Sequence, residues 1–243
     1  HKAHRKQNFH TTDGGVYGVP FTGNTWFMDY DTSVFSEDDV KSLDTMLEKG
    51  KVAFPLTDSW YIAAFYYANG CTIFGESGMD ADAGFDFGGD KAVAVTKYLV
   101  NLYNNANFSV DADGSGLSGL REGTVNAIFS GTWNAEAVKE ALGDNFGATQ
   151  LPTITIDGEA KQMRSFAGSK AIGVNPNCQN MQAAVALAVY LGSAEAQKAH
   201  YEMRGIVPTS NALSSDATVS ADIVAMAQAN TIANTSALQA TLP

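Results

Sequence analysis

Two tryptophans, Trp60 and Trp133, stand where a helical pattern begins just after a short polar segment, and neither has an aliphatic run beside it. A flat aromatic ring flanked by short polar groups can grip a sugar, because the apolar C–H face stacks while the hydroxyls find side-chain partners. Asp58 precedes Trp60 by two residues and could accept two hydrogen bonds from vicinal hydroxyls. Its alternative role is to cap the helix that follows. These residues favour a carbohydrate ligand.

Catalytic chemistry finds little support in the residue types. A glycoside hydrolase needs two carboxylates facing each other across the bond, and no spacing among the many acids singles out a pair. Three of the four histidines fall in the first ten residues and the fourth is His200, so neither a zinc motif nor a Ser-His-Asp set can be drawn. No phosphate-cradling glycine loop of the G-x-x-x-x-G-K-[ST] type occurs. We therefore expect a protein that is not an enzyme.

One segment fits a calcium-loop pattern, with oxygen ligands at the first, third, fifth and twelfth positions and glycine at the sixth. The residues at these positions are Asp111, Asp113, Ser115, Gly116 and Glu122. Ser118 stands where an aliphatic residue is usual, and Gly123 with a strand-like run follows where an exiting helix should begin. A solvated acidic loop is the alternative, and residues 78–90 form a weaker version of the same pattern. We expect no cofactor, with calcium at 111–122 as the open possibility.

Composition and charge limit the classes of partner that this chain could bind. The chain has 243 residues, enough for one large or two modest domains, and carries 15 basic against 26 acidic residues. This charge repels phosphate backbones and anionic lipid, so it argues against nucleic acid and membrane-surface partners. The most apolar run, residues 183–191, is too short to span a bilayer, and residues 1–10 lack the hydrophobic region of a signal peptide. The two cysteines, Cys71 and Cys178, are expected to be free and partly buried.

Periodicity predicts an α/β architecture with a mainly parallel sheet, because strands alternate with helices. Ser36 reads as an N-cap, and Gly50 ends the helix that it begins. A polar turn is expected at 22–25, a surface loop at 75–89 and a tight turn at Asp157 and Gly158. The predicted helices are 36–49, 60–68, 90–105, 135–142, 181–191, 194–203 and 221–229, and the predicted strands are 16–20, 26–30, 125–129, 146–151, 153–156 and 171–174.

Seven segments in order carry a family resemblance. They are GGVYGVPF (14–21), LEKGKVAFP (47–55) leading to DSW (58–60), LREGTVNAIFSGTW (120–133), FGATQLP (146–152), SFAGSKAIGV (165–174), YLGSAEAQ (190–197) and RGIVPTS (204–210). The chain resembles the extracellular solute-binding proteins of carbohydrate ABC importers, the class that includes maltose- and maltooligosaccharide-binding proteins. Each segment alone is weak, and their order makes the resemblance specific.

The resemblance implies a periplasmic-binding-protein-like (type II) two-lobe α/β fold, of which mostly the C-terminal lobe is present. It also implies a fragment that lacks the N-terminal part of the first lobe and the last helices. The expected divisions are a residual crossing segment at 1–21, the C-terminal lobe at 22–167, a return segment of the N-terminal lobe at 168–215 and a helix returning to the C-terminal lobe at 216–243. Apolar helix faces in the return segment are then expected to be exposed, and examples are Val185, Leu187, Val189 and Leu191.

In that family the ligand lies between the lobes, and lobe closure around it is what the importer senses. The resemblance makes Trp60 and Trp133 the stacking platforms, while Trp26 could line the cleft or pack beneath it. It adds three polar candidates, Asn24 at the hinge turn, Ser169 at the crossing loop and Arg204 at the cleft edge. The alternative for Asn24 is a capping or turn-forming role, and the alternative for Arg204 is a solvated or structural arginine.

The implied partners are a neutral oligosaccharide, with the malto type favoured, and the membrane permease of an ABC importer. The implied location is outside the cytoplasmic membrane, either periplasmic or on the cell surface through a lipid anchor, with no membrane insertion by this segment. Two other classes stay open at this point. One is a polysaccharide-adherence or calcium-dependent binding module, and the other is a glycoside hydrolase.

Overall fold

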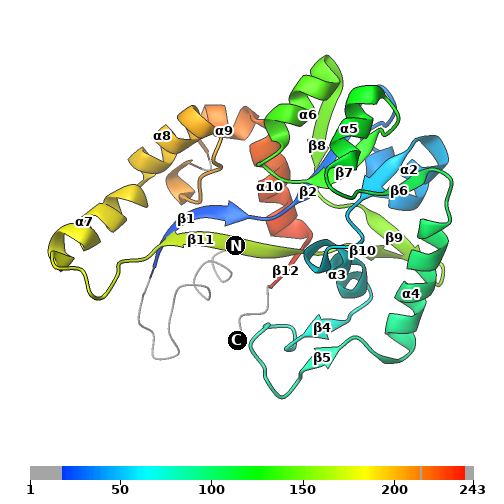
Figure 1. Cartoon of the computed structure of the whole chain (residues 1–243), viewed down its shortest axis with the longest axis horizontal. Helices are drawn as coiled ribbons and strands as arrows, with labels where there is room; N and C mark the ends of the chain where they lie inside the picture. The colour runs from blue at the N-terminus through cyan, green and yellow to red at the C-terminus, as the bar shows by residue number, and fades with distance from the viewer. Residues whose placement is uncertain (1–17, 214, 239–243) are drawn as a thin grey trace.

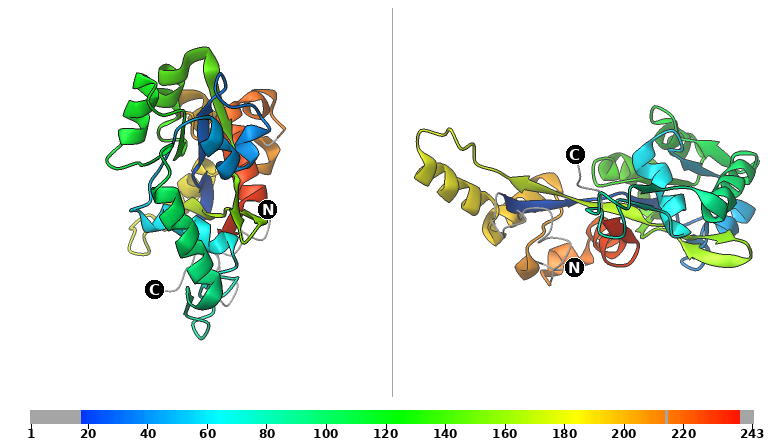
Figure 2. Two further views of the ribbon diagram at one scale, coloured as in Figure 1. Left: turned by 90° about the vertical axis from the view of Figure 1, so that its right-hand side faces the viewer. Right: turned by 90° about the horizontal axis from the view of Figure 1, so that it is seen from below.

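The computed structural model describes residues 18–213 and 215–238 of the chain, without the side chain of residue 238. The molecule has a body built on one mixed sheet and an arm that extends from it (Figure 1). The arm consists of β1 (Val19–Asn24) and β11 (Ser165–Ile172), which lead to α7 (Met181–Leu191) and α8 (Ala194–Arg204). Figure 2 shows that the arm is thin and stands away from the body.

The sheet of the body has the strand order β6-β3-β7-β2-β8. Its strands are β6 (Phe108–Val110), β3 (Val52–Phe54), β7 (Ala127–Ser130), β2 (Phe27–Asp31) and β8 (Phe146–Thr149). β3 pairs in parallel with β6 and β7, whereas β2 pairs antiparallel with both β7 and β8. Four of the five strands therefore run in one direction, which confirms a mainly parallel sheet, and only β2 is reversed. The reversal follows because β2 enters the body from the arm.

Helices cover both faces of this sheet. On one face the largest core cluster joins Met28, Phe54 and Phe129 of the sheet to α2 (Leu43–Lys49), α3 (Ser59–Ala68) and α4 (Gly89–Tyr103). On the other face α5 (Ser115–Glu122) and α6 (Ala135–Leu142) pack on Ile128, and α10 (Ile223–Asn234) packs on Phe27. The α/β class is confirmed.

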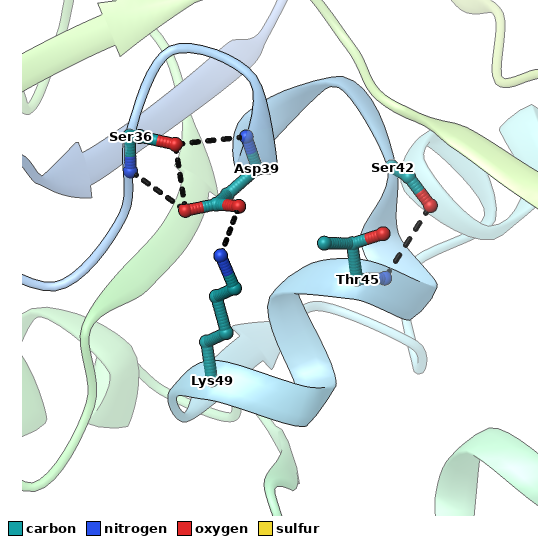
Figure 3. Close-up of polar contacts among 5 residues, drawn as sticks. All are labelled: Ser36, Asp39, Ser42, Thr45 and Lys49. Carbon is teal, nitrogen blue, oxygen red and sulfur yellow. Dashed lines mark hydrogen bonds and ion pairs between the residues drawn. The ribbon is translucent and has the colours of Figure 1, made fainter.

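The helix predicted at 36–49 is divided into two parts. Ser36 does cap a first turn, because its Oγ accepts from the Asp39 N–H at 3.3 Å, but that turn is a 3-10 helix, Asp39–Lys41. The chain is extended at Ser42, which forms a bridge with Thr153, and Ser42 then caps α2 by accepting from the Thr45 N–H (Figure 3). Lys49 at the far end of α2 forms an ion pair with Asp39 at 2.5 Å. The bridge to the strand at Thr153 is a long-range contact that helical periodicity does not reveal.

Several other boundaries differ from the sequence prediction. The 16–20 strand falls partly outside the described residues, and β1 continues to Asn24 through the predicted turn at 22–25. β11 begins six residues before the predicted strand at 171. Short strands and helices that were not predicted are β3, β6, α5, β4 (Thr72–Ile73), β5 (Phe85–Asp86), β10 (Glu159–Gln162), η2 (Gly143–Asn145), η3 (Asn211–Leu213), α9 (Ala217–Ala221) and β12 (Ser236–Leu238). The last predicted helix, 221–229, corresponds to α10.

Other predictions are confirmed. The helices α6 and α7 and the strand β9 (Thr153–Ile156) have the predicted bounds. The turn between β9 and β10 places Asp157 and Gly158 at φ values of 52° and 81°, which suits an Asp-Gly pair. The two cysteines are free, Cys71 buried and Cys178 half-buried. Within the described part of the chain, none of the helices is both long and apolar enough to cross a bilayer.

The arm carries the exposed apolar faces expected for the return segment. Val185, Leu187 and Val189 of α7 are all exposed, and Leu191 is half-buried rather than exposed. At the break between α7 and α8, Gly192 lies against Val19 of β1, so the end of α7 is the part that packs on the arm's strands. The rest of α7 is an apolar helix with little of its surface covered.

Candidate ligand-binding site

The candidate site lies where the three parallel strands of the body end. β3 and β6 end side by side, because Phe54 pairs with Val110, and β7 ends next to them at Ser130. β2 begins at the same edge, since Phe27 pairs with Ser130 in the antiparallel ladder. The segments that follow the parallel strands carry Asp58, Trp60, Asp111 and Trp133. The carboxyl edge of parallel strands is where open α/β sheets bind ligands.

Trp60 is held in place at the first turn of α3. Asp58 caps this helix, its Oδ1 accepting from the Trp60 N–H at 2.8 Å. The Trp60 carbonyl in turn accepts from the indole N–H of Trp26 at 3.4 Å. The Trp60 ring is half-buried and packs against two core clusters, one of which contains Phe166 of β11. Trp60 is therefore anchored on one side and exposed on the other.

Trp133 comes from the loop between β7 and α6, and its side chain is 49% exposed. The loop is a tight turn, in which the Asn134 N–H donates to the Gly131 carbonyl at 3.0 Å and the Asn134 amide donates to the Ser130 hydroxyl at 3.0 Å. The rings of Trp60 and Trp133 have centroids 5.9 Å apart and planes inclined by 35°. The structure thus brings together the two tryptophans that the sequence singled out, although they are 73 positions apart in the chain.

Trp26 lies in the core, and its prediction as a ligand-facing residue is wrong for this structure. Its side chain has 0% exposure, and its ring stacks on Tyr61 at 4.9 Å with edge contacts to Phe54 and Phe129. Trp26 directly precedes β2, and helix α3 covers it through Tyr61 in the same core cluster. Through its hydrogen bond to the Trp60 carbonyl, Trp26 supports the site from beneath.

Tyr61 is a site residue that the sequence reasoning missed. It is largely buried below Trp60, with ring centroids 5.4 Å apart. Burial raises the pKa of its hydroxyl above the ordinary value, and the negative charges of Asp58 and Asp111 raise that pKa further. The charges of both carboxylates thus act on the Tyr61 hydroxyl. A signal existed in the sequence, because Asp111 follows a short strand that ends at the same edge, but neither β3 nor β6 was recognised.

The remaining predicted contacts divide into two groups. Asn24 and Ser169 lie on neighbouring rungs of the β1–β11 ladder, where Asn24 pairs with Gly168 and Gly23 pairs with Ser169. Both are half-buried, and Asn24 is three residues before the start of β2. Arg204 is exposed at the end of α8, which lies on the arm side of the molecule, away from α3 (Figure 1). The structure does not bring Arg204 to the tryptophans.

Residues 111–122 do not form a calcium loop. Residues 115–122 are the helix α5, so Asp111 and Glu122 lie at its opposite ends instead of surrounding one point. Asp111 caps this helix, with Oδ1 accepting from the Gly116 N–H at 2.8 Å and from the Ser115 hydroxyl at 3.3 Å. Asp113 has φ 52° and precedes the helix on an exposed turn. Across the described residues, no group of three or more His, Cys, Asp or Glu side chains is placed to hold a metal ion.

A mixed sheet with helices on both faces, an aromatic pair at its carboxyl edge and two long strands that lead away into an arm are features of a periplasmic-binding-type fold. The chain belongs to the bacterial extracellular solute-binding protein family, whose pattern matches residues 3–227. The predicted family and fold are thereby confirmed, and the family description places its members outside the bacterial cell.

Named relatives agree with this assignment. The chain is 29% identical to a galactooligosaccharide-binding protein of Bacillus subtilis (strain 168), over 84% of this chain and 52% of the relative. It is 27% identical to a maltooligosaccharide ABC transporter solute-binding lipoprotein of Streptococcus pneumoniae (strain ATCC BAA-255 / R6), over 81% of this chain and 49% of the relative. The chain thus spans about half the length of the curated relatives it matches.

Solved structures show the same fold. One, described as being with acarbose, is 56% identical with a TM-score of 0.90, covering 94% of this chain and 60% of that chain. A maltodextrin-binding protein from L. casei BL23, solved without ligand, is 26% identical with a TM-score of 0.88, covering 98% of this chain and 66% of that chain. The likeness includes the arm, because it extends over nearly the whole of the described chain.

Proposed function

We propose that this chain is the sugar-recognising part of a carbohydrate ABC importer's extracellular receptor, and that it binds a neutral oligosaccharide, the malto type favoured. The observation that carries the proposal is the half-exposed pair Trp60 and Trp133 at the carboxyl edge of the sheet. Relatives support the proposal, because they are named for maltooligosaccharides, galactooligosaccharides and maltodextrin. The permease and a lipid anchor on the cell surface belong to the same proposal.

The ring geometry decides how a sugar would meet the two indoles. A sugar held between two facing rings needs their planes to be roughly 7 Å apart, because each carbon contact takes about 3.5 to 4 Å. The centroids of Trp60 and Trp133 are 5.9 Å apart, so the pair cannot enclose a pyranose. The two rings instead lie against each other as a tilted pair and together form one aromatic surface, which we call the aromatic wall. A ligand with more than one sugar unit could lie along this wall and use both rings.

The charges at the site favour a neutral ligand. Asp58 and Asp111 follow the carboxyl ends of β3 and β6, and both charges act on the Tyr61 hydroxyl, so they would repel an anionic sugar. Each has one carboxylate oxygen capping a helix, Asp58 on α3 and Asp111 on α5. Asp58 is exposed and uses Oδ1 for the helix cap, so its Oδ2 would accept hydroxyl hydrogen bonds from a ligand stacked on Trp60. Stacking would then supply affinity and the carboxylate would select among sugars.

We further propose that binding occurs without catalysis. A glycoside hydrolase needs a protonated carboxyl within reach of the glycosidic oxygen. Asp29, whose pKa burial raises, is wholly enclosed in β2 and cannot reach a ligand at the edge. The relatives are named as binding proteins. Incubation with maltopentaose followed by product analysis should show the sugar unchanged, and release of shorter sugars would defeat this part of the proposal.

Calorimetric titration of single variants tests the role of the two tryptophans. Replacing Trp60 or Trp133 by alanine should weaken binding of maltopentaose by about tenfold or more, because each ring supplies stacking area. Tyr103→Ala is the matched control, because Tyr103 is an aromatic residue that is 65% exposed. It lies at the end of α4, near the start of β6, and therefore at the edge of the sheet opposite the site. It should bind as the original chain does. Unchanged binding in both tryptophan variants would refute the site.

A further inference from the structure

Gly131 is in contact with the Trp133 ring. A methyl group built on Gly131 would lie 2.3 Å from Cζ3, 2.4 Å from Cη2 and 2.8 Å from Cε3 of Trp133, far inside van der Waals contact. The six-membered part of the indole therefore lies directly over the Gly131 backbone. No other residue contributes to these three closest contacts.

Space, and not backbone conformation, is what requires glycine at this position. Ten described glycines have positive φ, where a side chain would strain the backbone, and Gly131 is not among them. Gly131 is buried and directly follows β7, and its carbonyl accepts the hydrogen bond that closes the turn to Asn134. An alanine could adopt the same backbone, so its methyl group would act on the ring.

Of the two groups in this contact, only the Trp133 ring is free to move. Trp133 is 49% exposed, so its ring can swing outward, whereas the Gly131 backbone is fixed in the turn after the central strand. The ring is thus set between the Gly131 backbone and the Trp60 ring, 5.9 Å away. A methyl group at 131 would move the Trp133 ring at little cost to folding, but it would change the angle between the two indoles.

We infer that Gly131 is a positioning residue for the binding site: the absence of a side chain there sets the Trp133 ring against Trp60 and so fixes the shape of the aromatic wall offered to an oligosaccharide. The inference rests on the proposed sugar-binding function. It concerns how the wall is shaped, whereas the proposed function concerns whether the wall binds.

Gly131→Ala tests the inference through the two indoles. Circular dichroism in the indole bands reports coupling between neighbouring rings, and the Trp60–Trp133 contribution should be largely lost in Gly131→Ala, as it is in Trp133→Ala. Affinity for maltopentaose should fall about tenfold, with the thermal midpoint nearly unchanged. Gly88→Ala is the matched control, because Gly88 has φ −126° and nothing lies within 4 Å of an added methyl group. It should keep both the coupling and the affinity.

A double-mutant cycle separates positioning from a general defect. In a Trp133→Ala background, Gly131→Ala should cause no further loss of affinity, because the ring on which it acts is gone. An additional loss there, or unchanged coupling and affinity in Gly131→Ala alone, would overturn the inference. Normal binding by Trp133→Ala alone would also overturn the inference, whereas normal binding by both Trp133→Ala and Trp60→Ala is the outcome that refutes the proposed site. The two failures are therefore distinguishable.

Discussion

Asp29 should make the stability of this protein depend on pH in an unusual direction. Its side chain has 0% exposure in the inner strand β2, and neither carboxylate oxygen has a hydrogen-bond partner among the described residues. Burial raises the pKa of Asp29 well above its ordinary value, and the nearby charge of Lys139 opposes this only in part. The folded protein therefore holds the Asp29 proton more tightly than the unfolded chain does.

The sign of the effect follows from this difference. The contribution of protonated Asp29 to stability is complete below the unfolded pKa of about 4, and it is lost as the pH rises through the higher folded pKa. At pH 7 the loss cannot exceed about 4 kcal/mol, which is the free energy of protonating an ordinary carboxyl group there. The lower limit of this loss is about 1 kcal/mol, which is the smallest usual cost of burying an unpaired polar group.

Asp29→Asn is the test, because asparagine has the shape of the protonated acid and does not titrate. The free energy of unfolding at neutral pH should rise by about 1 to 4 kcal/mol, corresponding to a thermal midpoint higher by roughly 3 to 12 °C. Denaturation should be followed by circular dichroism from about pH 4 to about pH 8. Asp144→Asn, which removes an equal charge from an exposed site, is the control. If Asp29→Asn is no more stable at neutral pH and keeps the original pH profile, the reasoning is refuted.

Two further predictions concern the arm and the support of the site. The chain alone should self-associate through α7, where Leu187 and Val189 are 57% and 58% exposed. Replacing both residues by glutamate should shift the chain toward monomer in size-exclusion chromatography. A well-behaved monomer before substitution would contradict this prediction. Trp26→Phe should destabilise the protein by about 1 to 3 kcal/mol, because it removes a hydrogen bond to the Trp60 carbonyl and leaves a void. Urea denaturation measures this loss, and an unchanged free energy of unfolding would show that Trp26 does not support the site.

Local signals in the sequence were enough to predict most helices. α6 and α7 have the predicted bounds because helical periodicity and a C-terminal glycine mark them in the chain itself. β3 and β6 have three residues each, too few to show alternation, and the sheet could not be ordered without them. Long-range contacts explain the other differences, including the bridge from Ser42 to Thr153 that divides the 36–49 helix.

The candidate site was predicted in part. Trp60 and Trp133 were singled out from the polar segments before them, and the structure places them in contact. Trp26 could not be separated from them by residue type, since its burial depends on the packing of α3 over it. The roles of Tyr61 and Gly131 depend on which side chains lie over them, and no spacing in the sequence carries that information.

The indole N–H signals in a nitrogen-15 NMR spectrum test the central claim most directly. The chain has three tryptophans, so it should give three such signals, which single Trp→Phe variants assign. Titration with maltopentaose should shift the signals of Trp60 and Trp133 in a saturable way, and that of the enclosed Trp26 much less. Signals from Trp60 and Trp133 that stay in place while sugar is added to saturation would contradict the account.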